Sequence, residues 1–186
     1  MAEPGPPRIR PRRLLILVLI ALALIIGAGR IAAVRGQTPQ PTPFNPNTGP
    51  VVRVSYPPGW NLVSAPAGAP LPPSSRPIYT YAAGGYQTVD PSSTQPGVGY
   101  WAYYDAVTSQ SFPGGGPETF TLPIPAGQWI MIGNPRGSLV VVTGADAVYI
   151  YDPVQGYETT TVLEPGQGAW AFSYSGGTLT FTNAAP

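Results

Sequence analysis

The carboxylates are the side chains of this sequence with the greatest capacity for acid–base chemistry. The chain has no histidine and no cysteine, which excludes a histidine general base, a thiol nucleophile and a Ser-His-Asp triad. Asp146 and Asp152 flank a predicted strand, so at about 3.3 Å per residue their backbones lie roughly 20 Å apart. The paired carboxylates of glycosidases are much closer together. We therefore predict that the chain is not an enzyme, with an envelope hydrolase that uses these acids as an alternative.

The acidic residues occur in sequence contexts that are typical of turns. Asp90, Asp152 and Glu164 each stand directly before a proline, as turn-forming residues commonly do. A calcium-binding loop would need carboxylates at the Asp-x-Asp-x-Asp-Gly spacing, and the sequence does not contain that spacing. We expect no metal, and no feature of the sequence calls for a cofactor.

The charges divide the chain into a basic front and an acidic remainder. Residues 1–36 carry six arginines and one glutamate, a formal charge of +5, whereas residues 37–186 carry three arginines and seven acidic side chains, a formal charge of −4. There is no lysine. Because a nucleic-acid-binding surface needs clustered cationic side chains, we predict no nucleic-acid partner.

The front of the chain is typical of a membrane-targeting segment. Four arginines in residues 1–13 precede an uncharged run that is mostly Leu, Ile and Val. Residues 14–34 would span about 31 Å as a helix, enough for the hydrocarbon core, with Arg30 near the end of the span, where its side chain can reach the membrane surface. The leading arginines favour a cytoplasmic N-terminus. We predict a basic cytoplasmic segment at 1–13 and a transmembrane or signal-anchor helix at 14–34, with the rest of the chain outside the cell membrane. If the segment is instead cleaved as a signal peptide, the protein is secreted.

The tryptophans indicate an internal repeat. Trp60 and Trp129 are 69 residues apart, and so are Trp101 and Trp170. Their neighbours match as well, since PGVGYWAY at 96–103 corresponds to PGQGAWAF at 165–172. After a linker at 37–50, which contains five prolines and favours extended polyproline-like conformations, we therefore predict β repeat 1 at 51–117 and β repeat 2 at 118–186.

The pattern of the repeats predicts strands. Short apolar runs are bounded by glycine and proline, and no long stretch has a helical period. A unit of this size buries little apolar surface by itself. We predict an all-β fold of two tandem homologous antiparallel β units, sandwich or barrel-like, that share a core or a substantial interface and follow one N-terminal transmembrane helix. The predicted strands lie near 51–56, 60–65, 78–82, 86–89, 99–104 and 109–112, and near 118–123, 128–133, 139–143, 147–151, 157–162, 168–174 and 177–182.

The aromatic side chains admit two interpretations. We expect the four tryptophans to lie in the core, because a large ring fills the centre of a small β core. The tyrosines at alternate strand positions either pack in a core or half-buried setting, which we favour, or form an exposed stacking surface of the kind used for sugar rings. On the second interpretation, the candidate ligand-binding residues are Tyr79, Tyr81, Tyr104, Tyr149 and Tyr151.

The segments GWNL at 59–62 and PGVGYW at 96–101 resemble the opening and the close of a repeat found in exported bacterial proteins. The second copy departs from that pattern, with GQWI at 127–130 and Ala169 in place of the tyrosine. The resemblance implies an extracellular β-structured module without an established catalytic site, and it implies no functional residue.

These features favour a non-catalytic, membrane-anchored extracellular β module that presents an interaction surface, with the membrane and a cell-surface protein or polysaccharide as its partners. The alternative is a carbohydrate-binding module for envelope or external polysaccharide, because tryptophan and tyrosine are abundant and charge is low.

Overall fold

The computed structural model describes residues 50–82 and 84–184. They form antiparallel strands and two single-turn 3-10 helices, η1 (Pro66–Gly68) and η2 (Pro91–Ser93), so the predicted all-β class is confirmed. The first half (residues 51–113) contains β1 (Val51–Tyr56), β2 (Gly59–Ser64), β3 (Ile78–Ala82), β4 (Gly85–Val89), β5 (Gly99–Tyr104) and β6 (Thr108–Pro113). The second half (residues 119–183) contains β7 (Thr119–Ile124), β8 (Gln128–Gly133), β9 (Val140–Thr143), β10 (Ala147–Asp152), β11 (Gly156–Thr159), β12 (Val162–Leu163), β13 (Gly168–Ser173) and β14 (Gly177–Asn183).

The strand predicted at 157–162 is divided into β11 and β12. The Thr160 hydroxyl accepts a hydrogen bond from the Val162 N–H and donates one to the Val162 carbonyl. This local bonding turns the chain between the two strands, because threonine side chains compete with ladder pairing.

The predicted cytoplasmic segment at 1–13, the predicted transmembrane helix at 14–34 and the linker before residue 50 lie outside the described residues. Across residues 50–82 and 84–184, no helix combines the length and the hydrophobicity that crossing a membrane requires.

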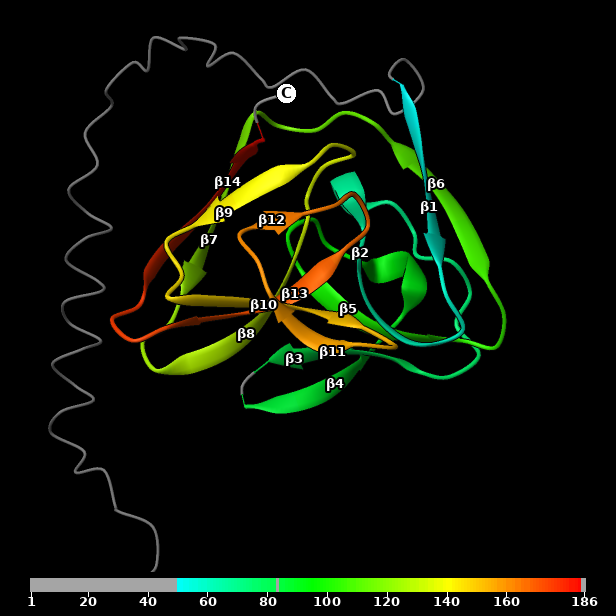
Figure 1. The fold of residues 1–186 in the computed structure, drawn as a ribbon, viewed down its shortest axis with the longest axis horizontal. Helices are drawn as coiled ribbons and strands as arrows, with labels where there is room; N and C mark the ends of the chain where they lie inside the picture. Colours follow the sequence, from blue (N-terminus) through cyan, green and yellow to red (C-terminus); the bar gives the residue numbers. More distant parts are fainter. Residues whose placement is uncertain (1–49, 83, 185–186) are drawn as a thin grey trace, which may run out of the picture. The chain divides into compact units, whose positions relative to one another are not determined.

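One four-stranded sheet of each half has the same strand order as its counterpart (Figure 1). The first half forms the sheet β2-β5-β3-β4, and the second half forms β8-β13-β10-β11. The antiparallel pair β1-β6 of the first half corresponds to the pair β7-β14 of the second half. In the second half, β9 and β12 extend this pair to a four-stranded sheet. In Figure 1 the β1-β6 pair lies at one side, β7, β9 and β14 lie at the other, and the sheets β2-β5-β3-β4 and β8-β13-β10-β11 lie between them.

The core is divided between the halves. One buried cluster contains only first-half residues, among them Val63, Ile78 and Phe112, and the other contains only second-half residues, among them Ile132, Leu179 and Phe181. The expectation of a shared core is therefore wrong, and the halves instead meet at an interface. Each half closes its own pair of sheets over an apolar centre, and the halves join through backbone hydrogen bonds and aromatic contacts.

The junction between the halves has the reciprocal contacts of a two-fold interface. Ser64 N–H donates to the Gly166 carbonyl, and its counterpart 69 residues later, Gly133 N–H, donates to the Gly97 carbonyl. The antiparallel bridges Val63 to Gln167 and Ile132 to Val98 repeat the same relation. Because each contact is matched by one with the roles of the halves exchanged, the junction has pseudo-two-fold symmetry.

Candidate functional site

Cross-strand pairs of aromatic residues cover one face of the sheet β2-β5-β3-β4 and one face of the sheet β8-β13-β10-β11. Residues that lie opposite each other on paired strands share a face, and in the first half these aromatic pairs are Trp60 with Tyr103, Tyr79 with Trp101, and Tyr81 with Tyr86. The corresponding pairs of the second half are Trp129 with Phe172, Tyr149 with Trp170, and Tyr151 with Tyr157. We call these residues together the aromatic face.

The aromatic face points away from the two cores. Along β5, the residues Tyr100, Ala102 and Tyr104 are buried, whereas the intervening Trp101 and Tyr103 are only half-buried, as the two-residue period of a strand requires. None of the four tryptophans is among the buried residues, and Trp129 is 40 % exposed. The prediction that the tryptophans fill the core is therefore wrong, because they occupy the outward positions of their strands.

The structure separates the predicted ligand-binding tyrosines into two groups. Tyr79, Tyr81, Tyr149 and Tyr151 lie half-buried on the aromatic face. Tyr104 instead is 1 % exposed and stacks on Tyr56 in the first-half core, with ring centroids 5.4 Å apart. Tyr104 is thus removed from the candidate set, because a ligand cannot reach a ring enclosed in the core.

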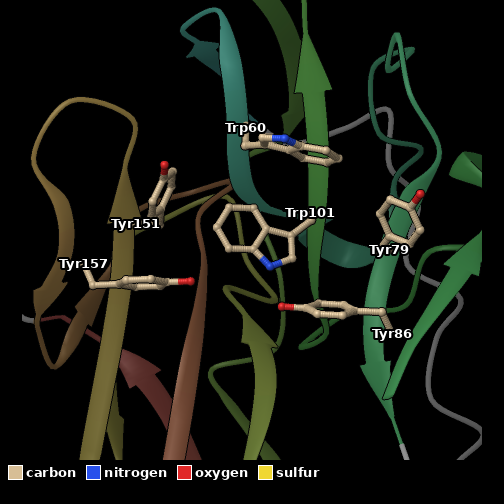
Figure 2. Close-up of a pocket in the computed structure, with 6 residues that line it drawn as sticks. All are labelled: Trp60, Tyr79, Tyr86, Trp101, Tyr151 and Tyr157. Atoms are coloured by element: carbon tan, nitrogen blue, oxygen red, sulfur yellow. The ribbon is translucent and has the colours of Figure 1, made fainter.

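A first groove, of about 410 Å³, crosses from one half to the other. Figure 2 shows Trp101 at its centre, with Trp60 on one side, Tyr79 and Tyr86 on a second and Tyr151 and Tyr157 on a third. The Trp101 and Tyr151 rings meet edge to face with centroids 5.0 Å apart. Groove 1 is lined by Trp60, Tyr79, Tyr86, Trp101, Tyr151 and Tyr157.

A second groove, of about 540 Å³, is the counterpart of the first. Tyr81 of the first half meets Trp170 of the second half edge to face, with centroids 5.2 Å apart. This contact mirrors that between Trp101 and Tyr151, since Trp170 corresponds to Trp101 and Tyr81 to Tyr151. Groove 2 is lined by Tyr81, Trp129, Tyr149, Tyr157 and Trp170, so the pseudo-two-fold relation of the junction extends to the grooves.

The polar atoms of the grooves are phenol hydroxyls and indole N–H groups. In Figure 2 the hydroxyls of Tyr86 and Tyr157 point toward the centre of groove 1. Partial burial raises the pKa of the Tyr157 hydroxyl, and a hydrogen bond with the Trp170 side chain offsets part of that increase. Tyr157 is therefore neutral at physiological pH and able to donate a hydrogen bond.

Charged side chains do not line either groove. Arg76 lies at the edge of the aromatic face, where its guanidinium stacks on the Tyr103 ring at 4.3 Å from the centroid. This contact is a cation–π interaction that covers one end of the face. The grooves themselves suit an uncharged ligand, because a charged group would lose hydration there without gaining a partner.

The acidic residues take the turn positions that their sequence contexts predict. The Asp90 carboxylate accepts from Ser92 N–H at the start of η2, and Asp152 accepts from Val154 N–H and Gln155 N–H. These bonds lower the pKa of both carboxyls, with the Ser92 hydroxyl contributing most at Asp90. Across residues 50–82 and 84–184, no group of three or more His, Cys, Asp or Glu side chains is placed to hold a metal ion.

The prediction from sequence did not identify most of the aromatic face, because it placed the tryptophans in the core. Tyr86 and Tyr157, which are 58 % and 55 % exposed, were also not singled out. The sequence contains a signal that could have identified these two tyrosines, since each directly follows the glycine at the start of the second strand of a hairpin.

No protein-family model, curated protein or solved structure matches this chain. The assignment of the site therefore rests on its geometry.

Proposed function

We propose that this chain is a non-catalytic binding module and that the aromatic face is its interaction surface. The observation that carries the proposal is the pair of grooves, each lined only by tryptophan and tyrosine. Partly exposed aromatic rings of this density are typical of binding surfaces. Combined with the sequence of residues 1–36, the proposal places the module outside the cell membrane, anchored by one N-terminal helix.

Loss of binding in groove variants tests the interaction surface. The full chain, tagged and held in detergent micelles, is incubated with envelope polysaccharide and separately with purified extracellular proteins of the same cells. We expect a retained ligand to be lost when Trp101→Ala and Trp170→Ala are combined and to be kept by Tyr174→Ala, because Tyr174 is 78 % exposed and lines neither groove. Retention that the double variant leaves unchanged would show that another surface binds.

The proposed location has its own test. A tag at the C-terminus should react with antibody on intact cells, because the arginines before the apolar segment favour a cytoplasmic N-terminus. A tag that reacts only after permeabilisation contradicts an extracellular module, and a tag found in the medium indicates cleavage of the N-terminal segment.

A second candidate function is carbohydrate binding, which the outward position of the tryptophans favours. Half-exposed rings can stack on the apolar face of a sugar ring, as aromatic side chains do in many binding sites. Tryptophan fluorescence of the full chain measured across a panel of neutral polysaccharides tests this function, since a bound glycan shifts the emission and protects the indoles from iodide.

We also infer that the two halves arose by duplication of one unit, in line with the resemblance of both to the Gly-Trp-Asn-Leu repeat. Three features support this inference: the 69-residue spacing of the tryptophans, the equal strand order of the sheets β2-β5-β3-β4 and β8-β13-β10-β11, and the reciprocal contacts at the junction.

A further inference from the structure

The chemistry of the groove linings restricts the ligand further, given the proposed role of the aromatic face. Indole N–H groups donate only, and phenol hydroxyls donate readily while accepting weakly with their single oxygen. The linings contain no amide, carboxylate or guanidinium group. A ligand that matches them has flat apolar surfaces for the rings and an excess of hydrogen-bond acceptors for the donors.

A polyproline II helix has these two properties. Its pyrrolidine rings are apolar and rigid, its backbone carbonyls are exposed because the helix has no internal hydrogen bonds, and each proline lacks an N–H. Its conformation is already formed before binding, so little entropy is lost when it docks in an aromatic groove. A neutral glycan fits the linings less well, because its hydroxyls donate as well as accept and the grooves offer few acceptors.

We infer that grooves 1 and 2 each bind a proline-rich peptide segment in the polyproline II conformation. The prolines pack between the rings of Trp101 and its neighbours in groove 1, and of Trp170 and its neighbours in groove 2. The hydroxyls of Tyr86 and Tyr157 donate to the carbonyls of the segment, as do the indole N–H groups other than that of Trp170, which donates to Tyr157. The partner is uncharged along the docked segment, because no charged side chain lines either groove.

The pseudo-two-fold relation between the two grooves predicts how many peptide segments bind to one chain. The cross-half contacts of Trp101 with Tyr151 and of Trp170 with Tyr81 have nearly equal centroid distances, 5.0 and 5.2 Å. Two equivalent grooves on one chain bind two segments. Tyr157 lines both grooves, and the Tyr86 ring of groove 1 also meets the Tyr81 and Trp170 rings of groove 2, with centroids 5.4 and 6.4 Å apart. By contrast, Trp60 lines groove 1 alone and Trp129 lines groove 2 alone, so each of these tryptophans is expected to affect one site.

The test uses isothermal titration calorimetry and tryptophan fluorescence on the full chain in detergent micelles. The probe is a synthetic peptide that copies residues 37–50, which contain five prolines and no charged residue, and the control peptide has serine at each proline. Two hosts are titrated, the natural chain and a chain in which Pro39, Pro41, Pro43 and Pro46 are serine, so that the result does not depend on the prolines of the host. We expect two peptides to bind per chain, with a blue shift of the emission and reduced quenching by iodide, and no binding of the control peptide.

Variants on the aromatic face separate the two grooves without disturbing the cores. We expect Trp60→Ala to weaken the site in groove 1 about tenfold, Trp129→Ala to weaken the site in groove 2 by a similar factor, Tyr157→Ala to weaken both, and Tyr174→Ala to weaken neither, since truncation of an anchoring aromatic commonly costs more than 1 kcal/mol. A cooperative thermal transition followed by far-ultraviolet circular dichroism shows that each variant is folded. Failure of the proline-rich peptide to bind either host overturns the inference.

Neutral polysaccharides are titrated in parallel. If a polysaccharide protects the tryptophans and the peptide does not, the polyproline assignment is wrong and the aromatic face stands as a carbohydrate-binding surface. If the binding found with cell material is independent of Trp101 and Trp170, the proposed function itself fails. The two failures are thus distinguishable.

Discussion

Gly99 packs so closely on Ile132 that a β-carbon at Gly99 would lie 2.4 Å from the Ile132 carbonyl oxygen. The counterpart of this pair, Gly168 on Val63, is equally close, with 2.6 Å between the corresponding atoms. Both glycines are the second glycine of a Pro-Gly-x-Gly segment. The fourth position of this segment therefore requires glycine, because the backbones of the two halves come too close there for a side chain.

Alanine at Gly99 or Gly168 should destabilise the protein strongly. The added methyl group meets backbone, which cannot rotate away, so we expect each variant to lose more than about 2 kcal/mol of unfolding free energy. Gly85→Ala is the matched control, because a β-carbon there meets nothing within 4 Å, and it should cost about 0.5 kcal/mol or less. Denaturant unfolding followed by circular dichroism measures all three. Equal midpoints for Gly99→Ala and Gly85→Ala would contradict a close junction between the halves.

Tyr104→Phe should leave the stability unchanged or increase it. The Tyr104 hydroxyl is buried and has no hydrogen-bond partner among the described residues, and a buried unpaired polar group costs about 1–3 kcal/mol. The neighbouring Tyr56 hydroxyl instead donates to the Gly166 carbonyl across the junction, so Tyr56→Phe should cost about 1 kcal/mol. Thermal unfolding of the two variants compares them directly. A Tyr104→Phe variant less stable than Tyr56→Phe would indicate a partner for the Tyr104 hydroxyl.

The fold could be predicted from sequence because the strands of this chain are bounded by local signals. Glycine and proline bracket short runs of apolar and aromatic residues, and those breakers act within a few positions. The absence of a shared core could not be predicted. It depends on how Ile132 and Val63 contact the opposite half through backbone atoms, and a hydrophobic pattern carries no information about which half covers a given apolar side chain.

The orientation of the aromatic residues was harder to predict because β5 has aromatic side chains on both faces. The sequence YWAYY at 100–104 offers no alternation to decide between Tyr104 and Trp101. The second half resolves the question, because the counterparts of Trp101 and Tyr103 are the aromatic Trp170 and Phe172, whereas the counterpart of Tyr104 is Ser173. Within β5 and β13, the residues that are aromatic in both halves are the ones on the aromatic face.

Alkaline titration should reveal a class of tyrosines that ionises only on unfolding. Burial raises the pKa values of Tyr56, Tyr100 and Tyr104 above the ordinary value of 10.0. Because the folded state favours their neutral form, their contribution to stability is fully present below pH 10 and is lost as the pH rises further. Absorbance at 295 nm should therefore show a late ionisation step that coincides with loss of the circular dichroism signal, and in guanidinium chloride a single step. Ionisation of all eleven tyrosines with the native signal intact would contradict the buried positions.

Asp152→Ala should make groove 1 less rigid without replacing any of the aromatic residues that line it. The Asp152 carboxylate accepts from Val154 N–H at 2.7 Å and from Gln155 N–H at 2.9 Å, which closes the hairpin that pairs Tyr151 with Tyr157. Without this acceptor, the amide protons of Val154 and Gln155 should exchange several-fold faster, and Tyr151 and Tyr157 should hold their relative position less well. Asp152→Asn retains an oxygen acceptor and serves as the matched control, with an exchange rate between those of the natural chain and the alanine variant.

The rigidity of groove 1 should also depend on pH, because the Asp152 carboxylate that closes this hairpin can be protonated. The two backbone hydrogen bonds lower the pKa of Asp152 below 3.8, so their contribution is present above that value and is lost as the pH falls through the lowered pKa. Exchange of the Val154 and Gln155 amides, corrected for the intrinsic effect of pH, should therefore accelerate in strong acid in the natural chain and not in Asp152→Asn, whose side chain does not titrate. Equal acid dependence in both chains would assign the effect to another carboxylate, and the hairpin would then not owe its shape to Asp152.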